Sequence, residues 1–387
     1  MTQFLRTTAL STRGARTLPQ RAYVSADVFA EEQERIFARR WLCVGRESRL
    51  AGAGDYLLYE MGRESLIVLR DQAGVIRALH NVCRHRGTRL CEAAEGRLSA
   101  TIQCPYHAWT YALDGRLIGV PDAKEIEDFD KADYPLVQAA VARWEGFVFV
   151  SLADEPEPFE EAFAPLIGRL RRWHLPSLVT GRRVDYDVAA NWKLLFQNYS
   201  ECYHCAPVHP SLVKLSPPTS GENDLVDGPV LGGFMVVNRP GGSLTASGRS
   251  CGLTVGELSD GDLQRVYYYS IFPNMLLSLH HDYVMVHTFR PLAPDRTAIT
   301  CEFLYHPETL VRPEFDADDA VRFWDMVNRE DWHICELTQR GVSSRAYRPG
   351  PYSRRESLSA AFDRYYRQAM EGTGQPCPAT STPRSAR

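Results

Sequence analysis

The sequence has no surplus of basic residues and no apolar segment long enough to cross a membrane. Its 387 residues include 44 Lys and Arg against 48 Asp and Glu, for a net charge of −4. Proteins that bind nucleic acid or anionic membranes through charge usually carry a basic surplus. A membrane-spanning helix needs roughly 20 consecutive apolar residues, and the longest apolar runs, such as 147–153, fall far short. We therefore expect no nucleic-acid partner and no membrane partner.

A secretion signal is also missing, although the chain contains ten cysteines. In a reducing compartment, cysteine serves as a metal ligand or as a small buried side chain. We therefore expect a cytoplasmic protein without disulfides. Residues 1–26 are rich in arginine and contain no acidic residue, a composition that organellar transit peptides share. We favour a different interpretation, in which an irregular arm is followed by a helix that Ser25 caps.

Glycines and prolines divide the chain into regions of different character. Between residues 41 and 152, glycines separate short runs rich in β-forming residues, which predicts a small antiparallel β domain. Beyond it, helical patterns alternate with strand patterns, and one antiparallel sheet with helices on one face is the natural packing. The expected helices lie at 159–173, 192–205 and 316–340, and the expected strands at 264–271, 283–290 and 297–305. We predict four regions: an N-terminal arm and helix at 1–40, the β domain at 41–152, a second domain at 153–372, and a disordered tail at 373–387.

Two pairs of cysteine and histidine lie in the expected β domain. Cys83 precedes His85 by two positions, Cys104 precedes His107 by three, and eighteen residues separate the pairs. A structural zinc ion would accept two thiolates and two imidazoles. A [2Fe–2S] cluster explains the pairing better, because two thiolates bind one iron and two imidazoles bind the other.

The sequence around these pairs resembles a known iron–sulfur motif. The segments NVCRHRGTRL and CPYHAWTYALDGRL are similar to the Rieske motif, in which each of two loops supplies one Cys and one His. The resemblance implies a [2Fe–2S] Rieske cluster with four ligands: Cys83, His85, Cys104 and His107.

The segment ECYHCAPVH at residues 201–209 contains a second group of potential ligands. Its C-x-x-C, formed by Cys202 and Cys205, could be a redox dithiol or half of a zinc site. The βαβ context of thioredoxin-like proteins is absent here. We therefore interpret both cysteines as small buried side chains.

The two histidines of the same segment, His204 and His209, can bind one metal ion. They are five positions apart, and Pro207 is expected to end the helix between them, so that both imidazoles can converge on one ion. A carboxylate would complete a facial triad with open positions, which is the geometry of non-haem iron oxygenases.

The longer run NWKLLFQNYSECYHCAPVHP resembles the catalytic motif of Rieske oxygenases. This resemblance implies that His204 and His209 bind a mononuclear Fe(II). Glu201 corresponds to the acid that links a Rieske histidine of one subunit to the iron ligand of the next. The alternative for Glu201 is a solvated carboxylate on a helix.

The third iron ligand is expected far along the chain. The segment NREDWHICELTQRGVSS is similar to the family's distal helix and places Asp331 as the ligand. Three carboxylates nearby compete for this role: Asp325, Glu330 and Glu336. His333 is expected to point to a different face of the helix.

The two sites together define an expected class of enzyme. A Rieske cluster and a mononuclear iron in one chain imply reductive O2 activation, in which the cluster delivers electrons and a small organic substrate is oxidised. The chain is identified as a member of the α (terminal oxygenase) components of Rieske non-haem iron oxygenases. The resemblance covers about residues 18–370 and implies an α+β fold: an antiparallel β Rieske domain and a helix-grip-like catalytic domain of antiparallel sheet covered by helices. A Rieske electron-transfer protein is the alternative of another class.

Electrons have to come from another protein. No G-x-G-x-x-G follows an expected strand, and no four-cysteine ferredoxin spacing is present. We therefore expect a separate NAD(P)H-dependent reductase with flavin and iron–sulfur centres. Family precedent implies a homotrimer, in which the useful cluster and iron face each other across a subunit interface.

The substrate is expected to be a quaternary methylammonium compound. Glu at position 201 and a self-contained α chain resemble the branch that oxidises glycine betaine, proline betaine, choline and carnitine, by monooxygenation or N-demethylation. Aromatic faces at Tyr203 and at 267–269 could hold a methylammonium cation. Successive strand residues alternate faces, so at least one of the three strand tyrosines serves packing. Hydroxylation of an aromatic ring, by mono- or dioxygenation, is the alternative.

Overall fold

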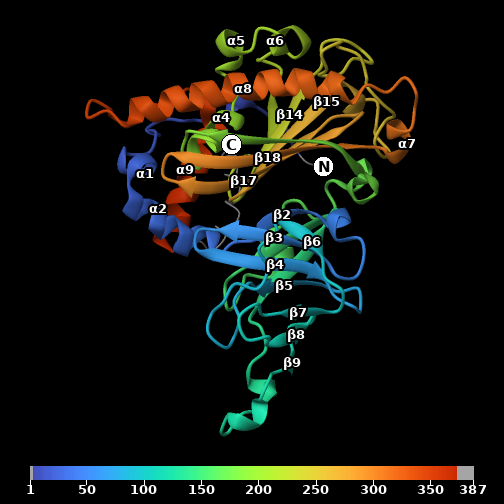
Figure 1. The fold of residues 1–387 in the computed structure, drawn as a ribbon. Helices are drawn as coiled ribbons and strands as arrows, with labels where there is room; N and C mark the ends of the chain where they lie inside the picture. The colour runs from blue at the N-terminus through green and yellow to red at the C-terminus, as the bar shows by residue number, and fades with distance from the viewer. Residues whose placement is uncertain (1–2, 373–387) are drawn as a thin grey trace, which may run out of the picture.

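The computed structural model describes residues 3–372, apart from the side chain at position 317, so the expected disordered tail at 373–387 lies outside the described residues. Figure 1 shows two layers of β structure, with most of the helices around the larger sheet. The expected α+β class is confirmed. None of the helices within the described range combines the length and the apolar character that a membrane crossing requires.

The smaller part of the molecule is built from antiparallel strands. Seven of them form one sheet in the order β2-β11-β10-β5-β4-β3-β6, and three more form a small sheet, β7-β8-β9. Their bounds are β2 Leu42–Arg46, β3 Asp55–Met61, β4 Glu64–Arg70, β5 Ile76–His80, β6 Glu95–Arg97, β7 Thr101–Gln103, β8 Thr110–Ala112, β9 Leu117–Gly119, β10 Gln138–Trp144 and β11 Phe147–Ser151.

The larger part is an eight-stranded antiparallel sheet in the order β1-β13-β14-β15-β16-β17-β18-β12. Its strands are β1 Leu5–Arg6, β12 Val179–Val188, β13 Glu222–Leu225, β14 Val230–Val236, β15 Arg265–Ile271, β16 Met275–Leu279, β17 Val284–Ala293 and β18 Arg296–Tyr305. The three strands expected in this part all form, within a residue or three of their expected ends. The arm that we expected to be irregular contributes the short edge strand β1.

Helices cover one face of this sheet. The longest is α8 Ala317–Val342, which crosses the sheet as Figure 1 shows, beside α4 Trp192–Tyr199 and α9 Ser357–Glu371. The other helices are α1 Arg21–Val24, α2 Ala26–Glu32, α3 Phe159–Ala162, α5 Cys205–Val208, α6 Leu212–Leu215 and α7 Pro307–Leu310. The oxygen of Ser25 accepts the N–H of Val28, so the expected cap of α2 is present.

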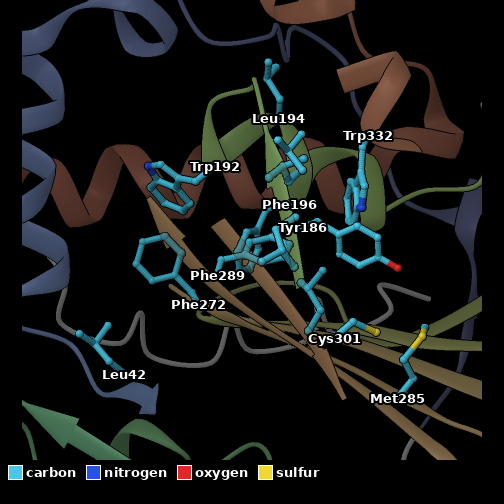
Figure 2. Packing of buried hydrophobic residues seen from close by; sticks show 14 of the residues in the cluster. Leu42, Tyr186, Trp192, Leu194, Phe196, Phe272, Met285, Phe289, Cys301 and Trp332 are labelled. Atoms are coloured by element: carbon cyan, nitrogen blue, oxygen red, sulfur yellow. The ribbon is translucent and has the colours of Figure 1, made fainter. Parts of the chain in front are cut away.

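The core between the helices and the sheet is aromatic. Trp192 and Phe196 of α4 pack against Phe272 and Phe289, with ring centroids 5.8 Å and 5.2 Å apart in the two pairs (Figure 2). Each such buried ring contributes about 1.5–3 kcal/mol to stability. This packing fixes α4, and with it the turn that follows α4, on the sheet.

Two expected helices are shorter than predicted. The helix expected at 192–205 ends at Tyr199, because the next residues form a turn and Pro207 lies inside the separate short helix α5 rather than ending the first one. A proline is tolerated in the first turn of a helix, where its missing N–H has no partner to lose. The helix expected at 159–173 ends at Ala162, and Gly168, with φ of +75°, interrupts any continuation.

Candidate metal centres

The structure brings the three predicted iron ligands together. His204 lies in the turn before α5, His209 at the end of α5, and Asp331 in the middle of α8. The Nε2 atoms of the two histidines are 3.2 Å apart, and Oδ1 of Asp331 lies 3.3 Å from Nε2 of His204 and 3.0 Å from Nε2 of His209. Two imidazole nitrogens and one carboxylate oxygen therefore converge on one point, as a facial triad for iron requires.

Two further carboxylates contact the imidazoles at their Nδ1 atoms, on the side of each ring away from the triad. Oε1 of Glu201 lies 2.7 Å from Nδ1 of His204, and Oε2 of Glu330 lies 2.7 Å from Nδ1 of His209. A hydrogen bond at Nδ1 keeps the proton there and leaves Nε2 as the ligand atom. Sequence reasoning treated Glu330 as a competitor of Asp331, whereas in the structure it faces the outer nitrogen of an imidazole.

The remaining competitors and His333 lie away from the triad. Asp325 accepts a hydrogen bond from the hydroxyl of Tyr186 at 2.9 Å, and Glu336 accepts the N–H of Ala189 at 3.2 Å. His333 is exposed, on another face of α8. Asp331 is therefore the carboxylate of the group that points at both Nε2 atoms.

The charges of this group favour a cation. Burial lowers the pKa of His204, but hydrogen bonds to Asp331 and Glu201 outweigh it and raise the pKa to about 10. Burial likewise lowers the pKa of His209, and Asp331 and Glu330 raise it above its ordinary value. The pKa of Asp331 is lowered, because its two imidazole partners outweigh the effect of burial. Three carboxylates surround two imidazoles, so a divalent ion fits both the ligand set and the charge.

The C-x-x-C within the same turn forms a disulfide, which contradicts our expectation. Cys202 and Cys205 are bonded, with Cα atoms 4.9 Å apart, within the range that a disulfide requires. The turn after α4 creates this proximity, which the spacing alone did not reveal. Cys205 is buried, as expected, whereas Cys202 is only half-buried, contrary to expectation. Sγ of Cys205 lies 3.9 Å from Nε2 of His204.

The two Cys–His loops of the smaller part have matching backbones. In the first, the N–H of Gly87 donates to the carbonyl of Cys83, and in the second the N–H of Ala108 donates to the carbonyl of Cys104. Gly87 has φ of +75° and Ala108 has φ of +54°, so each loop turns through a left-handed residue at the same position. The two loops therefore share one turn geometry, although His85 follows its cysteine by two residues and His107 by three.

The side chains of these loops fit an iron–sulfur cluster with mixed ligands. Cys83 and Cys104 are each 2% exposed, whereas His85 is exposed and His107 half-buried. The two imidazole rings lie 4.7 Å apart. Burial raises the pKa of the Cys104 thiol, but hydrogen bonds from the following backbone N–H groups and with Cys83 outweigh burial and lower it below its ordinary value, whereas burial raises the pKa of Cys83. One of the two cysteines is therefore the more ready to form the thiolate that iron binds.

A cavity adjoins the candidate iron site on the helix-covered side of the sheet. Aromatic side chains form part of its lining: Tyr199, Tyr203, Tyr268, Trp324 and Trp332. Tyr267 and Tyr269 instead pack into the core with residues of the opposite face, so the expected alternation of the strand tyrosines is confirmed. His287 of β17 also lines the cavity, and burial lowers its pKa to about 4. Sequence reasoning missed His287, because a histidine in the apolar run VMVHTF looks like part of a core.

The chain matches two family models. The model described as "Ring hydroxylating alpha subunit (catalytic domain)" matches residues 175–372, and the model described as "Rieske [2Fe-2S] domain" matches residues 40–130. The chain therefore belongs to the ring-hydroxylating α subunits, the oxygenase components of Rieske non-haem iron systems. It is an oxidoreductase that carries a [2Fe–2S] Rieske cluster and a mononuclear iron.

Individual relatives show which members of this family the chain resembles. The glycine betaine monooxygenase oxygenase subunit of Chromohalobacter salexigens is 33% identical, over 88% of this chain and 83% of that protein. The crystal structure of the quaternary ammonium Rieske monooxygenase CntA in complex with gamma-butyrobetaine is 26% identical, with a TM-score of 0.76 over 92% of this chain and 95% of that one. Naphthalene 1,2-dioxygenase from Rhodococcus sp. shares the fold, with a TM-score of 0.75 over 93% of this chain and 95% of that one at 23% identity.

Proposed function

We propose that this chain oxidises a quaternary methylammonium compound, by monooxygenation of a methyl group that ends in N-demethylation. The cluster ligands of the proposal are Cys83, His85, Cys104 and His107, and the iron ligands are His204, His209 and Asp331. The bound iron, supplied with electrons through the cluster, provides the activation of O2. One observation carries the choice of substrate: the triad adjoins an aromatic cavity in a chain that is similar, over most of its length, to a glycine betaine monooxygenase oxygenase subunit.

The lining of the cavity suits a methylammonium cation. Tyr203, Tyr268 and Trp324 can present π faces, which attract a cation that carries no N–H donor. Glu201 and Asp331 add negative charge at the same end. Their charge is partly balanced by the imidazoles and the metal, so the aromatic faces supply the specific recognition. An aromatic hydrocarbon would gain from the same walls but would not use the charge.

Glu201 is the proposed link for electrons. One oxygen meets Nδ1 of His204, and the other accepts the N–H groups of Tyr203 and His204. This carboxylate is therefore held in place and stays partly accessible, with a side chain 12% exposed. A carboxylate in this position can orient His204 on one side and accept a hydrogen bond from a second imidazole on the other.

The arrangement of the chain supports electron transfer between subunits, and family precedent points to a homotrimer. The Rieske loops lie beside β7 and β8, at the opposite end of the molecule from α5 and α8 (Figure 1). Electron transfer within one chain would have to pass from one end of the molecule to the other. In a closed ring of three subunits, the loops of one subunit can approach Glu201 of its neighbour. A separate reductase supplies the electrons from NAD(P)H.

A substrate panel tests the proposal. The purified oxygenase, supplied with a surrogate Rieske-oxygenase reductase, NADH and O2, is offered glycine betaine, choline, carnitine, naphthalene and benzoate. We expect formaldehyde in proportion to the consumption of a methylammonium compound. Diol or phenol formation from an aromatic compound, without turnover of any methylammonium compound, would refute the proposal in favour of ring hydroxylation.

A further inference from the structure

A buried histidine in the wall of the cavity has no use in the sites described above. His287 on β17 is 1% exposed and lines the cavity. Neither of its ring nitrogens makes a hydrogen bond of ordinary geometry within the described residues, although burial lowers the pKa of the ring and the side chain of Asn328 acts on it in the opposite direction. Its ring meets the edge of Trp332 at 6.0 Å between centroids, so it faces the turn of α8 that carries Asp331. A buried polar group without a partner is destabilising, so its presence in a ligand cavity calls for an explanation, and contact with the ligand is one.

Three hydroxyl groups of the cavity are already engaged, whereas the indole nitrogen of Trp332 in the same wall has no partner. The hydroxyls of Tyr199, Ser200 and Ser270 donate to backbone carbonyls at 3.0 Å, 2.6 Å and 3.4 Å. The amide nitrogen of Asn223 on β13 also lacks a partner. However, β13 lies four strands away from β17, about 19 Å at the usual spacing between strands. A small substrate that contacts His287 therefore cannot also contact Asn223.

We propose that His287 binds an oxygen atom of the substrate and thereby turns the methyl groups of the ammonium end, which are equivalent to one another, toward the iron site. This inference rests on the proposed function, because it concerns the polar end of the same methylammonium compound. A neutral imidazole has one N–H donor, which suits a carboxylate or a hydroxyl oxygen, and one acceptor nitrogen. The aromatic faces hold the ammonium end, and the hydrogen bond fixes the orientation of the molecule between them. His287 is thus a positioning residue that contacts substrate but takes no part in bond breaking.

Binding measurements can isolate this contact. We would titrate the holoenzyme, without O2 and without reductant, with glycine betaine, choline and tetramethylammonium, using isothermal titration calorimetry. Glycine betaine carries a carboxylate, choline carries a hydroxyl, and tetramethylammonium carries neither. His287→Leu removes the donor, and His287→Gln restores an N–H donor in a side chain without the ring.

The expected result is selective. His287→Leu should raise the Kd of glycine betaine, of choline, or of both by about tenfold, the scale of one hydrogen bond in a dry site. The Kd of tetramethylammonium should change by less than about twofold, and His287→Gln should recover part of the lost affinity. A loss with glycine betaine alone identifies the carboxylate as the bound group, and a loss with choline alone identifies the hydroxyl.

Two matched variants control for folding and for the rest of the cavity. His280 is likewise 1% exposed, and its ring nitrogens also lack partners, but it stacks on Tyr283 at 4.0 Å. His280→Leu should leave all three affinities unchanged, and Asn223→Leu tests the unpartnered amide on the far side of the cavity. Rieske absorption and the iron content show whether each variant has folded.

Three outcomes would overturn the inference. They are an equal loss for tetramethylammonium, an unchanged affinity for both oxygen-bearing compounds, and a selective loss in Asn223→Leu but not in His287→Leu. If the wild-type enzyme binds none of the three compounds, the proposed function itself fails, and that result is distinct because it appears before any substitution.

Discussion

Replacing Glu330 by Gln is predicted to weaken iron binding without removing a ligand. Oε2 of Glu330 lies 2.7 Å from Nδ1 of His209, whereas the triad uses Nε2 of the same ring. Gln keeps the length of the side chain and one carbonyl oxygen that accepts the Nδ1 proton, but it removes the charge. The imidazole should therefore keep its tautomer and become a weaker donor to the metal.

The size of the effect follows from the geometry. Carboxylates that hold a metal-bound histidine contribute about 10–100-fold to metal affinity, and each factor of ten corresponds to about 1.4 kcal/mol. The side chain of Glu330 is 29% exposed, so solvent screens part of its charge. We expect the lower end of the range, about a tenfold increase in the Kd for Fe(II), with the Rieske cluster intact.

Anaerobic competition with a chelator measures this constant. Glu336→Gln is the matched control, because Glu336 lies on the same helix and accepts a backbone N–H from Ala189 without touching an imidazole. Asp331→Asn is the reference for the loss of a true ligand and should remove nearly all of the iron. If Glu330→Gln emptied the site as completely as Asp331→Asn, Glu330 would be a ligand. If it changed nothing, the role of Glu330 as a support for His209 would be wrong.

Further predictions concern the metals, the electron path and the core. The purified protein should hold three irons and two acid-labile sulfides per chain. His204→Ala should remove one of these irons and leave the Rieske absorption unchanged. Zinc without acid-labile sulfide would contradict both metal assignments. Glu201→Gln should keep iron and substrate binding but slow single-turnover oxidation of a chemically reduced cluster by orders of magnitude, and unchanged rapid-mixing kinetics would refute the bridge. Lys193 and Glu32 form a fully buried ion pair at 2.5 Å, so Lys193→Met should cost about 3–5 kcal/mol of stability, seen as a lower urea midpoint that the exposed control Lys214→Met does not share.

Features that depend on neighbours in the sequence were predictable. Each Cys–His pair belongs to one short loop, so the spacing in the sequence was enough to predict that Cys83 lies near His85 and Cys104 near His107. The long helix expected at 316–340 forms as Ala317–Val342, because a local capping residue, Asp316, and a 3.6-residue pattern determine it. The same reasoning placed strands β15, β17 and β18 with small errors at their ends.

Features that depend on the competition between a helix and a turn over a few residues were predicted less well. The residues after Tyr199 had the pattern of a continuing helix, but the carboxylate of Glu201 accepts the N–H groups of Tyr203 and His204 and stabilises a turn instead. That turn also brings Cys202 and Cys205 to bonding distance. Composition predicted reduced cysteines, and it carries no information on the distance between two sulfur atoms.

The sequence by itself determined the class of the protein, because motif spacing specifies which residue types can share a metal. Only the tertiary structure decided which carboxylate points at the two imidazoles and which residues surround this group. Asp331 lies 122 residues from His209, and their contact depends on how α8 packs across the sheet. A strand pattern of period two separated Tyr268 from Tyr267 and Tyr269, but it did not say which face holds the cavity. That choice, and the placement of His287 in the cavity wall, follow from long-range packing of helices on one face of the sheet, which no local pattern encodes.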